Sequence, residues 1–142
     1  MAKYKFTLSP WIKTYVEGVI EYYPDNKKQL ALLKDSMIPS QISQYGPHAG
    51  SGFDSEQRPT EDISIRLNAE YIREQERIIL AVESVFTKLS DQDRELIRLR
   101  YWSGELTPDG VALKLNIELS TMYYRLNNIQ VEIARRLGLV NL

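Results

Sequence analysis

The 142-residue chain contains no cysteine and a single histidine, His48. Without thiols it has no disulfide framework, no thiolate zinc site and no cysteine nucleophile. His48 lies in a Gly/Pro-rich stretch, and no second histidine is present to complete a metal site or to share catalytic work. These absences argue against hydrolytic and metal-assisted enzymes. We therefore expect a protein that is not an enzyme and that holds no cofactor and no metal.

Long hydrophobic runs are also missing. The longest aliphatic run, Ile78–Val82, is far shorter than the ~20 residues that span a bilayer. The first residues include no apolar stretch of the ~7–15 residues that a signal peptide needs. At 43% hydrophobic and 26% charged residues, the composition is nevertheless that of an ordinary globular protein. We expect a cytoplasmic protein without a membrane segment.

An excess of charge of either sign is absent as well, since the formal net charge is −1. Residues 89–142 carry seven basic and seven acidic side chains. A protein that holds DNA by general attraction to phosphates has an excess of basic side chains, and this region has none. Any binding of nucleic acid must depend on a local patch, on dimerisation or on a partner.

The first periodic segment opens at Ser9 and Pro10, a favoured N-cap followed by a favoured first helical residue. Apolar residues then recur at intervals of three and four, which predicts a helix over 10–23. Pro24 predicts a stop, and a second short helix is expected over 25–38. The aromatic side chains of this region form either a core stripe or a partner surface, with the core favoured: Trp11, Tyr15, Tyr22 and Tyr23.

Residues 39–59 are rich in Gly, Pro and Ser, which predicts a loop or linker. Thr60 is the expected N-cap of a long central helix of about 28 residues. A helix of this length and wide apolar face either braces a bundle or pairs with another copy of the chain, and core packing is favoured. Its two apolar stripes are Leu67, Tyr71, Ile78, Val82, Val85 and Leu89, and Ile65, Ile72, Ile79 and Phe86.

Ser90, with Asp93 three residues later, is close to a capping box and predicts a further helix that ends near Gly104. Nothing in the sequence predicts a strand, so we expect an all-α fold. Three regions are predicted: an N-terminal helical region, a loop or linker, and a long helix with a C-terminal DNA-binding motif. They comprise residues 1–38, 39–59 and 60–142.

Residues 107–126 carry the pattern of a helix-turn-helix. Thr107 is a suitable N-cap with Pro108 at the first helical position, and small Ala112 allows a second helix to cross closely. Asn116 suits a left-handed turn conformation. The second helix has the buried stripe Met122, Leu126, Ile129, Ile133 and Leu137. In DNA-binding proteins the second helix of this motif enters the major groove.

Helical geometry predicts that DNA would contact the face of this second helix that points away from its apolar stripe. That face carries hydroxyl, amide and aromatic side chains and one guanidinium, which suit base edges and phosphates. Lys and Glu would be more usual on a face that only meets solvent, so contact with nucleic acid is favoured. The predicted DNA-binding residues are Thr107, Lys114, Leu119, Ser120, Thr121, Tyr123, Tyr124, Arg125, Asn127 and Asn128.

The segment from Leu89 to Trp102, followed by Thr107 and the helix-turn-helix, resembles the fourth conserved region of bacterial sigma factors. The wider pattern is similar to that of phage-encoded RinA/ArpU-type late transcriptional regulators. The shared features are an N-terminal helical part, a Gly/Ser-rich loop, a Pro-Thr-led long helix, a Tyr-Trp pair and a basic helical ending. The residues that carry them are Pro59-Thr60, Tyr101-Trp102 and Ile133-Ala134-Arg135-Arg136-Leu137-Gly138. Glu118 departs from the pattern, because Ser usually caps the recognition helix.

This resemblance implies a bacteriophage or prophage activator that acts on double-stranded promoter DNA of late genes, with RNA polymerase, in the host cytoplasm. The roles it implies are base reading for Leu119, Ser120 and Tyr124, phosphate contact for Thr107 and Arg125, and polymerase contact for Arg94, Arg98 and Arg100. Two alternatives remain open. One is a module that binds RNA polymerase or a sigma factor without reading DNA, and the other is a DNA-packaging recognition subunit. Self-association through the long helix is a further expectation.

Overall fold

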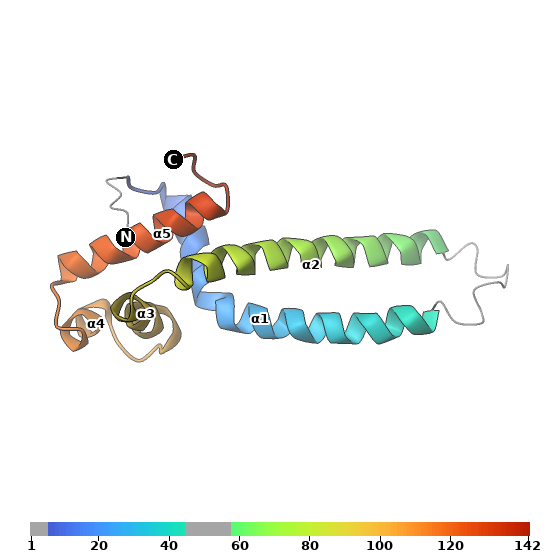
Figure 1. The fold of residues 1–142 in the computed structure, drawn as a ribbon, viewed down its shortest axis with the longest axis horizontal. Coiled ribbons are helices and arrows are strands. Elements are labelled where there is room, and N and C mark those ends of the chain that lie inside the picture. The colour runs from blue at the N-terminus through green and yellow to red at the C-terminus, as the bar shows by residue number, and fades with distance from the viewer. Residues whose placement is uncertain (1–5, 45–57) are drawn as a thin grey trace. The chain divides into compact units, whose positions relative to one another are not determined.

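Helices make up all the regular secondary structure of the described residues, which are 6–44 and 58–142 of this computed structural model (Figure 1). Side chains are described for 6–35 and 63–142. The all-α expectation is therefore confirmed over this part of the chain. In order, the elements are α1 (Pro10–Gln44), α2 (Arg58–Phe86), α3 (Asp91–Ile97), the π-helical turn η3 (Arg98–Trp102), α4 (Pro108–Lys114) and α5 (Leu119–Arg136).

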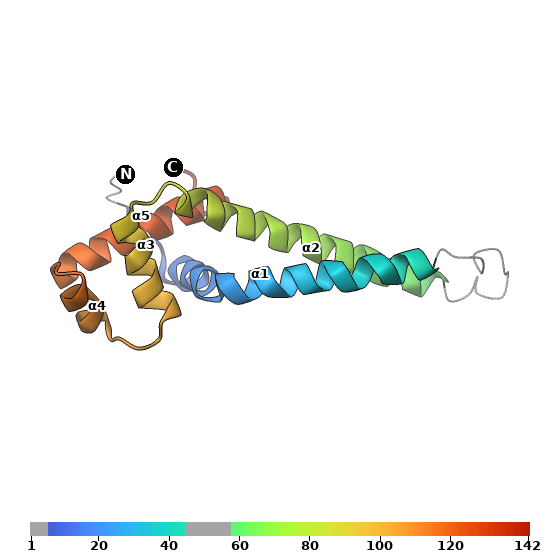
Figure 2. The same ribbon diagram turned by 60° about the horizontal axis from the view of Figure 1, so that its bottom comes forward.

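The chain packs as two units, and both α1 and α2 run through the two. The core unit comprises residues 6–23 and 78–142 and includes all the helices after α2. The hairpin unit comprises residues 24–44 and 58–77, where α1 and α2 run side by side (Figures 1 and 2). This division by packing falls inside two helices, whereas the division predicted from composition falls at the Gly/Pro/Ser-rich segment.

An apolar cluster fills the core unit and draws residues from every helix in it. The four predicted core residues within α5 and its C-cap Leu137 are all buried, which confirms the stripe. Burying one side chain of this size contributes roughly 1.5–3 kcal/mol, so this cluster is the main source of stability. Its largest fully buried members are Ile20, Leu96, Ile97, Met122, Ile129 and Ile133.

The predicted helix break at Pro24 is wrong, because α1 is one helix of 35 residues. Proline has no amide hydrogen, so Pro24 cannot donate to the carbonyl of Ile20 four residues earlier. In this structure the indole Nε1 of Trp102 donates to that carbonyl at 2.8 Å. A tertiary contact thus satisfies the acceptor that proline leaves free, and helix propensity is overridden.

The boundaries of the predicted loop also change. α1 continues past Pro39 to Gln44, and α2 begins at Arg58 rather than after a cap at Thr60. The rest of the predicted loop, residues 45–57, lies outside the described residues.

The aromatic stripe expected in the core is mostly exposed. Trp11, Tyr15 and Tyr22 are open to solvent, while Tyr23 packs against Phe86 with ring centroids 5.6 Å apart. The buried face of α1 is instead aliphatic, because Ile12, Val16 and Ile20 recur every four residues and occupy it. Helical spacing alone did not decide which of the two stripes would be covered.

The segment between α2 and α3 is held by two caps. Ser90 is the N-cap of α3, and its hydroxyl oxygen accepts from the amide of Asp93 at 3.2 Å, as predicted. The guanidinium of Arg94 donates to the carbonyls of Phe86 and Thr87, at 3.1 and 3.0 Å. Because those carbonyls lie at the negative end of α2, a cation there satisfies both hydrogen bonding and the helix dipole.

The helix predicted to end near Gly104 does so through a π-helical turn rather than a regular one. In η3 the amide of Ser103 donates to the carbonyl of Arg98, five residues back, at 2.9 Å. The extra residue in this turn lets neighbouring aromatic residues both bond to α1. Trp102 reaches Ile20, and the Tyr101 hydroxyl donates to the carboxylate of Glu17 at 3.2 Å.

Replacing Trp102 with Phe tests the bond to the free carbonyl. We expect Trp102→Phe to lower the free energy of unfolding by about 1–3 kcal/mol, because a part-buried acceptor loses its donor. In a Pro24→Ala background, residue 24 regains an amide that can bond Ile20, so the cost should fall by about 1 kcal/mol. Urea unfolding of the four proteins, followed by circular dichroism, measures the difference. Equal costs in the two backgrounds would contradict this account.

The half-buried phenol of Tyr101 should make stability sensitive to alkaline pH. Burial, and then the charge of Glu17, raise the pKa of Tyr101 well above its ordinary value of about 10. A group with a raised native pKa contributes stability that is present below pH ~10 and lost as the pH rises above it. Between about pH 9 and 11 the wild type should therefore lose more stability than Tyr101→Phe. Urea unfolding across this range is the measurement, with Tyr22→Phe as the exposed control that should behave as wild type.

Candidate nucleic-acid interface

The candidate interface is built by α4, the turn after it and α5. Thr107 caps α4, and its side-chain oxygen accepts from the amide of Gly110 at 3.1 Å. After α4, Asn116 adopts the predicted left-handed conformation with φ of 57°, and the amide of Ile117 donates to the carbonyl of Ala112 at 3.0 Å. This closed turn sets α5 against α4, which gives the expected helix, turn and helix (Figure 1).

α5 begins without a side-chain cap. Its N-cap residue is Glu118, which makes no hydrogen bond to the first amides of the helix. An acidic side chain is favourable near these amides, but it also stands beside the surface proposed for phosphates. The first amides of α5 therefore have no cap from the Glu118 side chain, unlike those of α3 and α4.

The predicted DNA-binding residues fall into three groups by exposure. The exposed ones lie on α4 and the first two turns of α5: Thr107, Lys114, Leu119, Ser120, Tyr123 and Tyr124. The half-buried ones are Thr121, Arg125 and Asn127. One, Asn128, is buried. Tyr123 and Tyr124 are each 44% exposed, and neither side-chain hydroxyl forms a hydrogen bond to another described residue.

The placement of Asn128 on the reading face is wrong. The turn of α5 formed by residues 128–131 is buried on every side, so that Val131, which points away from the stripe of Met122 and Ile129, is fully buried. The N-terminal segment contributes to this cover, because the Asn127 amide donates to the carbonyl of Phe6 at 3.0 Å. Asn127 thereby anchors the N-terminal segment, and the free face of α5 ends near Tyr124.

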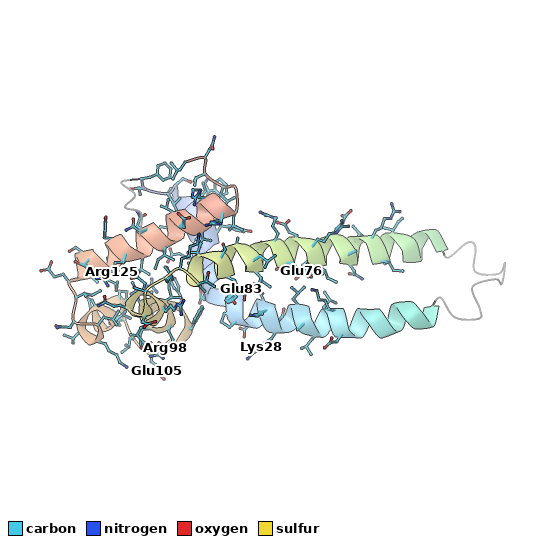
Figure 3. All side chains as sticks on the ribbon, in the orientation of Figure 1. Lys28, Glu76, Glu83, Arg98, Glu105 and Arg125 are labelled. Atoms are coloured by element: carbon cyan, nitrogen blue, oxygen red, sulfur yellow. The ribbon has the colours of Figure 1, made fainter. Side chains whose placement is uncertain are left out.

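Arg125 has a partner inside the fold. One of its guanidinium nitrogens lies 3.9 Å from the carboxylate of Asp93, and that carboxylate is buried. The pair links α5 to the first turn of α3 at a distance too long for a hydrogen bond. Arg125, labelled in Figure 3, is therefore a structural cation as well as a candidate for phosphate contact.

The three arginines implied to face RNA polymerase differ in availability. Arg94 caps α2, and Arg100 is half-buried, 4.0 Å from Glu17. Arg98 is exposed but donates two hydrogen bonds to Glu95, at 2.9 and 2.5 Å. Those bonds lower the pKa of the Glu95 carboxyl, and the charge of Lys114 on α4 adds to the effect. Arg94 and Arg98 are thus both exposed and both bonded within the fold, while Arg100 is less accessible.

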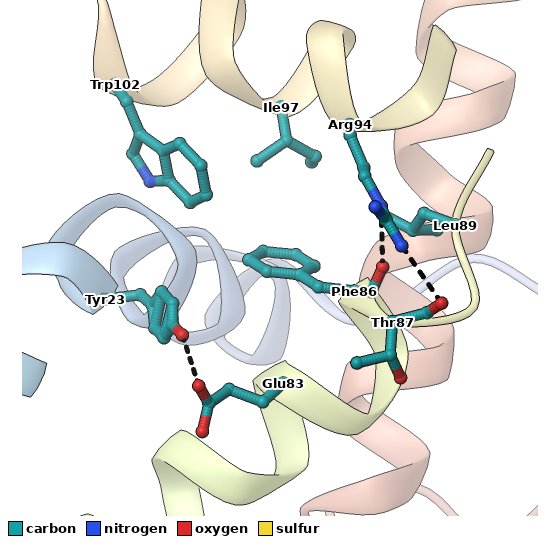
Figure 4. A pocket seen from close by; sticks show the side chains of 8 residues that line it. All are labelled: Tyr23, Glu83, Phe86, Thr87, Leu89, Arg94, Ile97 and Trp102. Carbon is teal, nitrogen blue, oxygen red and sulfur yellow. Dashed lines mark hydrogen bonds between the residues drawn. The ribbon is translucent and has the colours of Figure 1, made fainter. Parts of the chain in front are cut away.

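Sequence reasoning missed two features of this region. Leu113 on α4 is 82% exposed beside Lys114, and the signal was its position off the buried pair Val111 and Ala112. The second is a pocket of about 320 Å³ on the core unit (Figure 4). Its lining is Tyr23, Glu83, Phe86, Thr87, Leu89, Arg94, Ile97 and Trp102.

The pocket is mainly a packing feature. Tyr23, Phe86 and Trp102 contact one another, with ring centroids 5.6 to 6.1 Å apart. The polar groups on its wall are engaged, since the Tyr23 hydroxyl donates to Glu83 at 2.7 Å and Arg94 bonds to α2 (Figure 4). We assign no ligand to it.

No family model, curated protein or solved structure matches this chain. Within the described residues no helix is long and apolar enough to cross a membrane. The same part of the chain contains no cluster of three or more His, Cys, Asp or Glu side chains that could hold a metal ion.

The pair between Arg125 and Asp93 decides how a substitution at Arg125 is interpreted. Arg125→Ala should lower the free energy of unfolding by about 1–3 kcal/mol, because it leaves the Asp93 carboxylate buried without its cation. Asp93→Asn removes that charge, so Arg125→Ala should cost much less in the Asp93→Asn background. Urea unfolding of the three variants and the wild type measures this. An Arg125→Ala protein as stable as the wild type would show that the pair contributes nothing.

Proposed function

We propose that this chain is a sequence-specific DNA-binding regulator of transcription, in which the first two turns of α5 enter the major groove. The observation that carries the proposal is the contrast along α5. The side chains of Ser120, Tyr123 and Tyr124 are exposed and form no hydrogen bond to another described residue, whereas residues 128–131 farther along the helix are all buried. A helix anchored at one end and presenting unpaired hydroxyl groups at the other suits a recognition helix.

The balance of charge determines how such binding would work. Of the basic side chains near the interface, Arg98 is paired with Glu95 and Arg125 with Asp93, and Lys114 is exposed. At most three cations can then contact phosphates. A plot of the logarithm of the DNA-binding constant against the logarithm of salt concentration should therefore have a slope no steeper than about −3 per chain. Affinity then depends on direct contacts and on shape more than on general attraction to phosphates.

The biological setting is proposed from the sequence resemblance over residues 58–138. It supports an activator of phage or prophage late genes that acts with the RNA polymerase of a bacterial host. The proposed contacts are base edges for Leu119, Ser120 and Tyr124, and phosphates for Thr107, Lys114 and Arg125.

A second function, a module that binds RNA polymerase without reading DNA, is supported by two observations. Residues 89–142 have no net charge, and Leu113 is 82% exposed on α4. Large exposed apolar side chains are more useful against a protein than against phosphates.

Selection from a random pool of double-stranded DNA separates these functions. The purified full chain is used once alone and once with bacterial RNA polymerase. Enrichment of one motif by the chain alone supports the DNA-binding regulator. Enrichment only with polymerase, or capture of polymerase without a motif, favours the second function. Failure of both overturns the proposal.

The reading face is tested with Tyr124→Ala. We expect at least tenfold weaker binding to the selected motif, because an exposed contact side chain is removed while the core is untouched. Thermal unfolding should change little. Tyr22→Ala is the matched control, since Tyr22 is also an exposed helical tyrosine and lies on α1. Equal affinities of Tyr124→Ala and the wild type would remove Tyr124 from the interface.

A further inference from the structure

We propose that the hairpin unit is a docking surface for a second copy of this chain, through an apolar stripe on α2 formed by Ile63, Leu67 and Tyr71. The inference is independent of the proposed function, because it concerns residues 24–35 and 63–77 and requires no DNA. Mass in solution and cross-linking test it without DNA.

The first observation is that the hairpin unit has no core of its own. None of its described side chains, in 24–35 and 63–77, is buried. The three stripe residues Ile63, Leu67 and Tyr71 are 49%, 59% and 54% exposed. Two antiparallel helices cannot enclose an apolar stripe between them, whereas four helices packed as a bundle can.

The second observation is an open groove between the two helices. It has a volume of about 240 Å³, and Leu30 and Leu33 of α1 face Tyr71 of α2 across it. Beside it the ammonium of Lys34 forms an ion pair with the carboxylate of Glu76. The polar side chains of Asn26, Gln29 and Gln75 complete the lining of the groove. Tyr71 belongs both to the groove and to the stripe, so the stripe reaches the groove.

The third observation is that the stripe continues a face that is buried elsewhere on the same helix. Toward the end of α2, Val82 and Val85 of the predicted stripe are covered in the core unit. The apolar pattern of α2 therefore continues along the helix, but only its later part is covered by other residues of the chain. We infer that the exposed part is covered in the assembled protein.

Symmetry and charge identify the occupant. The stripe residues are spaced four apart, so a two-fold axis at Leu67 sets Leu67 against its copy and Ile63 against Tyr71 of the copy. Residues 63–77 carry three Arg and three Glu, so a second copy meets no net repulsion and a highly charged partner finds no complement. A self-complementary and neutral surface fits another copy of this chain.

Mass in solution provides the first test. By sedimentation velocity the full chain should have twice its mass of 16.5 kDa, and Leu67→Glu should reduce this to one chain. Leu80→Glu is the matched control: Leu80 lies on the same helix and is 64% exposed, but 13 residues place it about 220° around the helix. Circular dichroism confirms that each variant is folded. A monomeric wild type, a ring of many chains, or equal dissociation by Leu80→Glu would overturn the proposal.

Cross-linking tests the geometry, since the chain has no cysteine of its own. Under oxidation, Leu67→Cys should form a disulfide-linked dimer. Ile63→Cys should not, because antiparallel copies hold these residues about 12 Å apart along the axis, beyond disulfide reach. Ile63→Cys combined with Tyr71→Cys should cross-link again. Efficient cross-linking by Ile63→Cys alone would indicate parallel copies and overturn the two-fold arrangement at Leu67.

Discussion

The burial of one turn of α5, residues 128–131, on every side is the constraint on which the core unit depends. Val131 and Asn128 lie on the side of the helix away from its apolar stripe, yet both are buried. The hydroxyl of Tyr101 accepts from Gln130 in this turn, and next to it the Asn127 amide donates to the carbonyl of Phe6. Because this turn of the helix is fixed, the first two turns of α5 can stay exposed without losing their direction.

Polar bonds determine how α1 joins this arrangement. The Gln130 amide of α5 donates to the Tyr101 hydroxyl at 2.7 Å, and that hydroxyl donates to Glu17 of α1. Trp102 supplies the second link, to the Ile20 carbonyl. Both aromatic residues stand in the π-helical turn, so one irregular turn connects three helices. Partly buried polar groups of this kind cost stability when unpaired, which makes the connection specific as well as strong.

The parts of the fold that local chemistry controls could be predicted from the sequence. The Ser90 and Thr107 caps and the left-handed Asn116 depend on a few adjacent atoms, and all three are present. Features decided by distant residues could not be predicted. The sequence around Pro24 predicts a helix stop unless a donor such as Trp102 is known to lie near Ile20. The helical pattern places Asn128 toward solvent, and only the packing of the whole core unit buries it.

The same reasoning explains why α2 carries an apolar pattern longer than the core requires. Its stripe runs from Ile63 to Val85, but only the later residues are buried by the rest of the core unit. Large exposed apolar residues at regular spacing oppose solubility unless another surface covers them. The hairpin has no core of its own, and the DNA-binding surface proposed above is confined to two turns of α5. Under the two proposals, a pair of copies joined at the hairpin carries two such surfaces, so the few cations of each are doubled in the assembly.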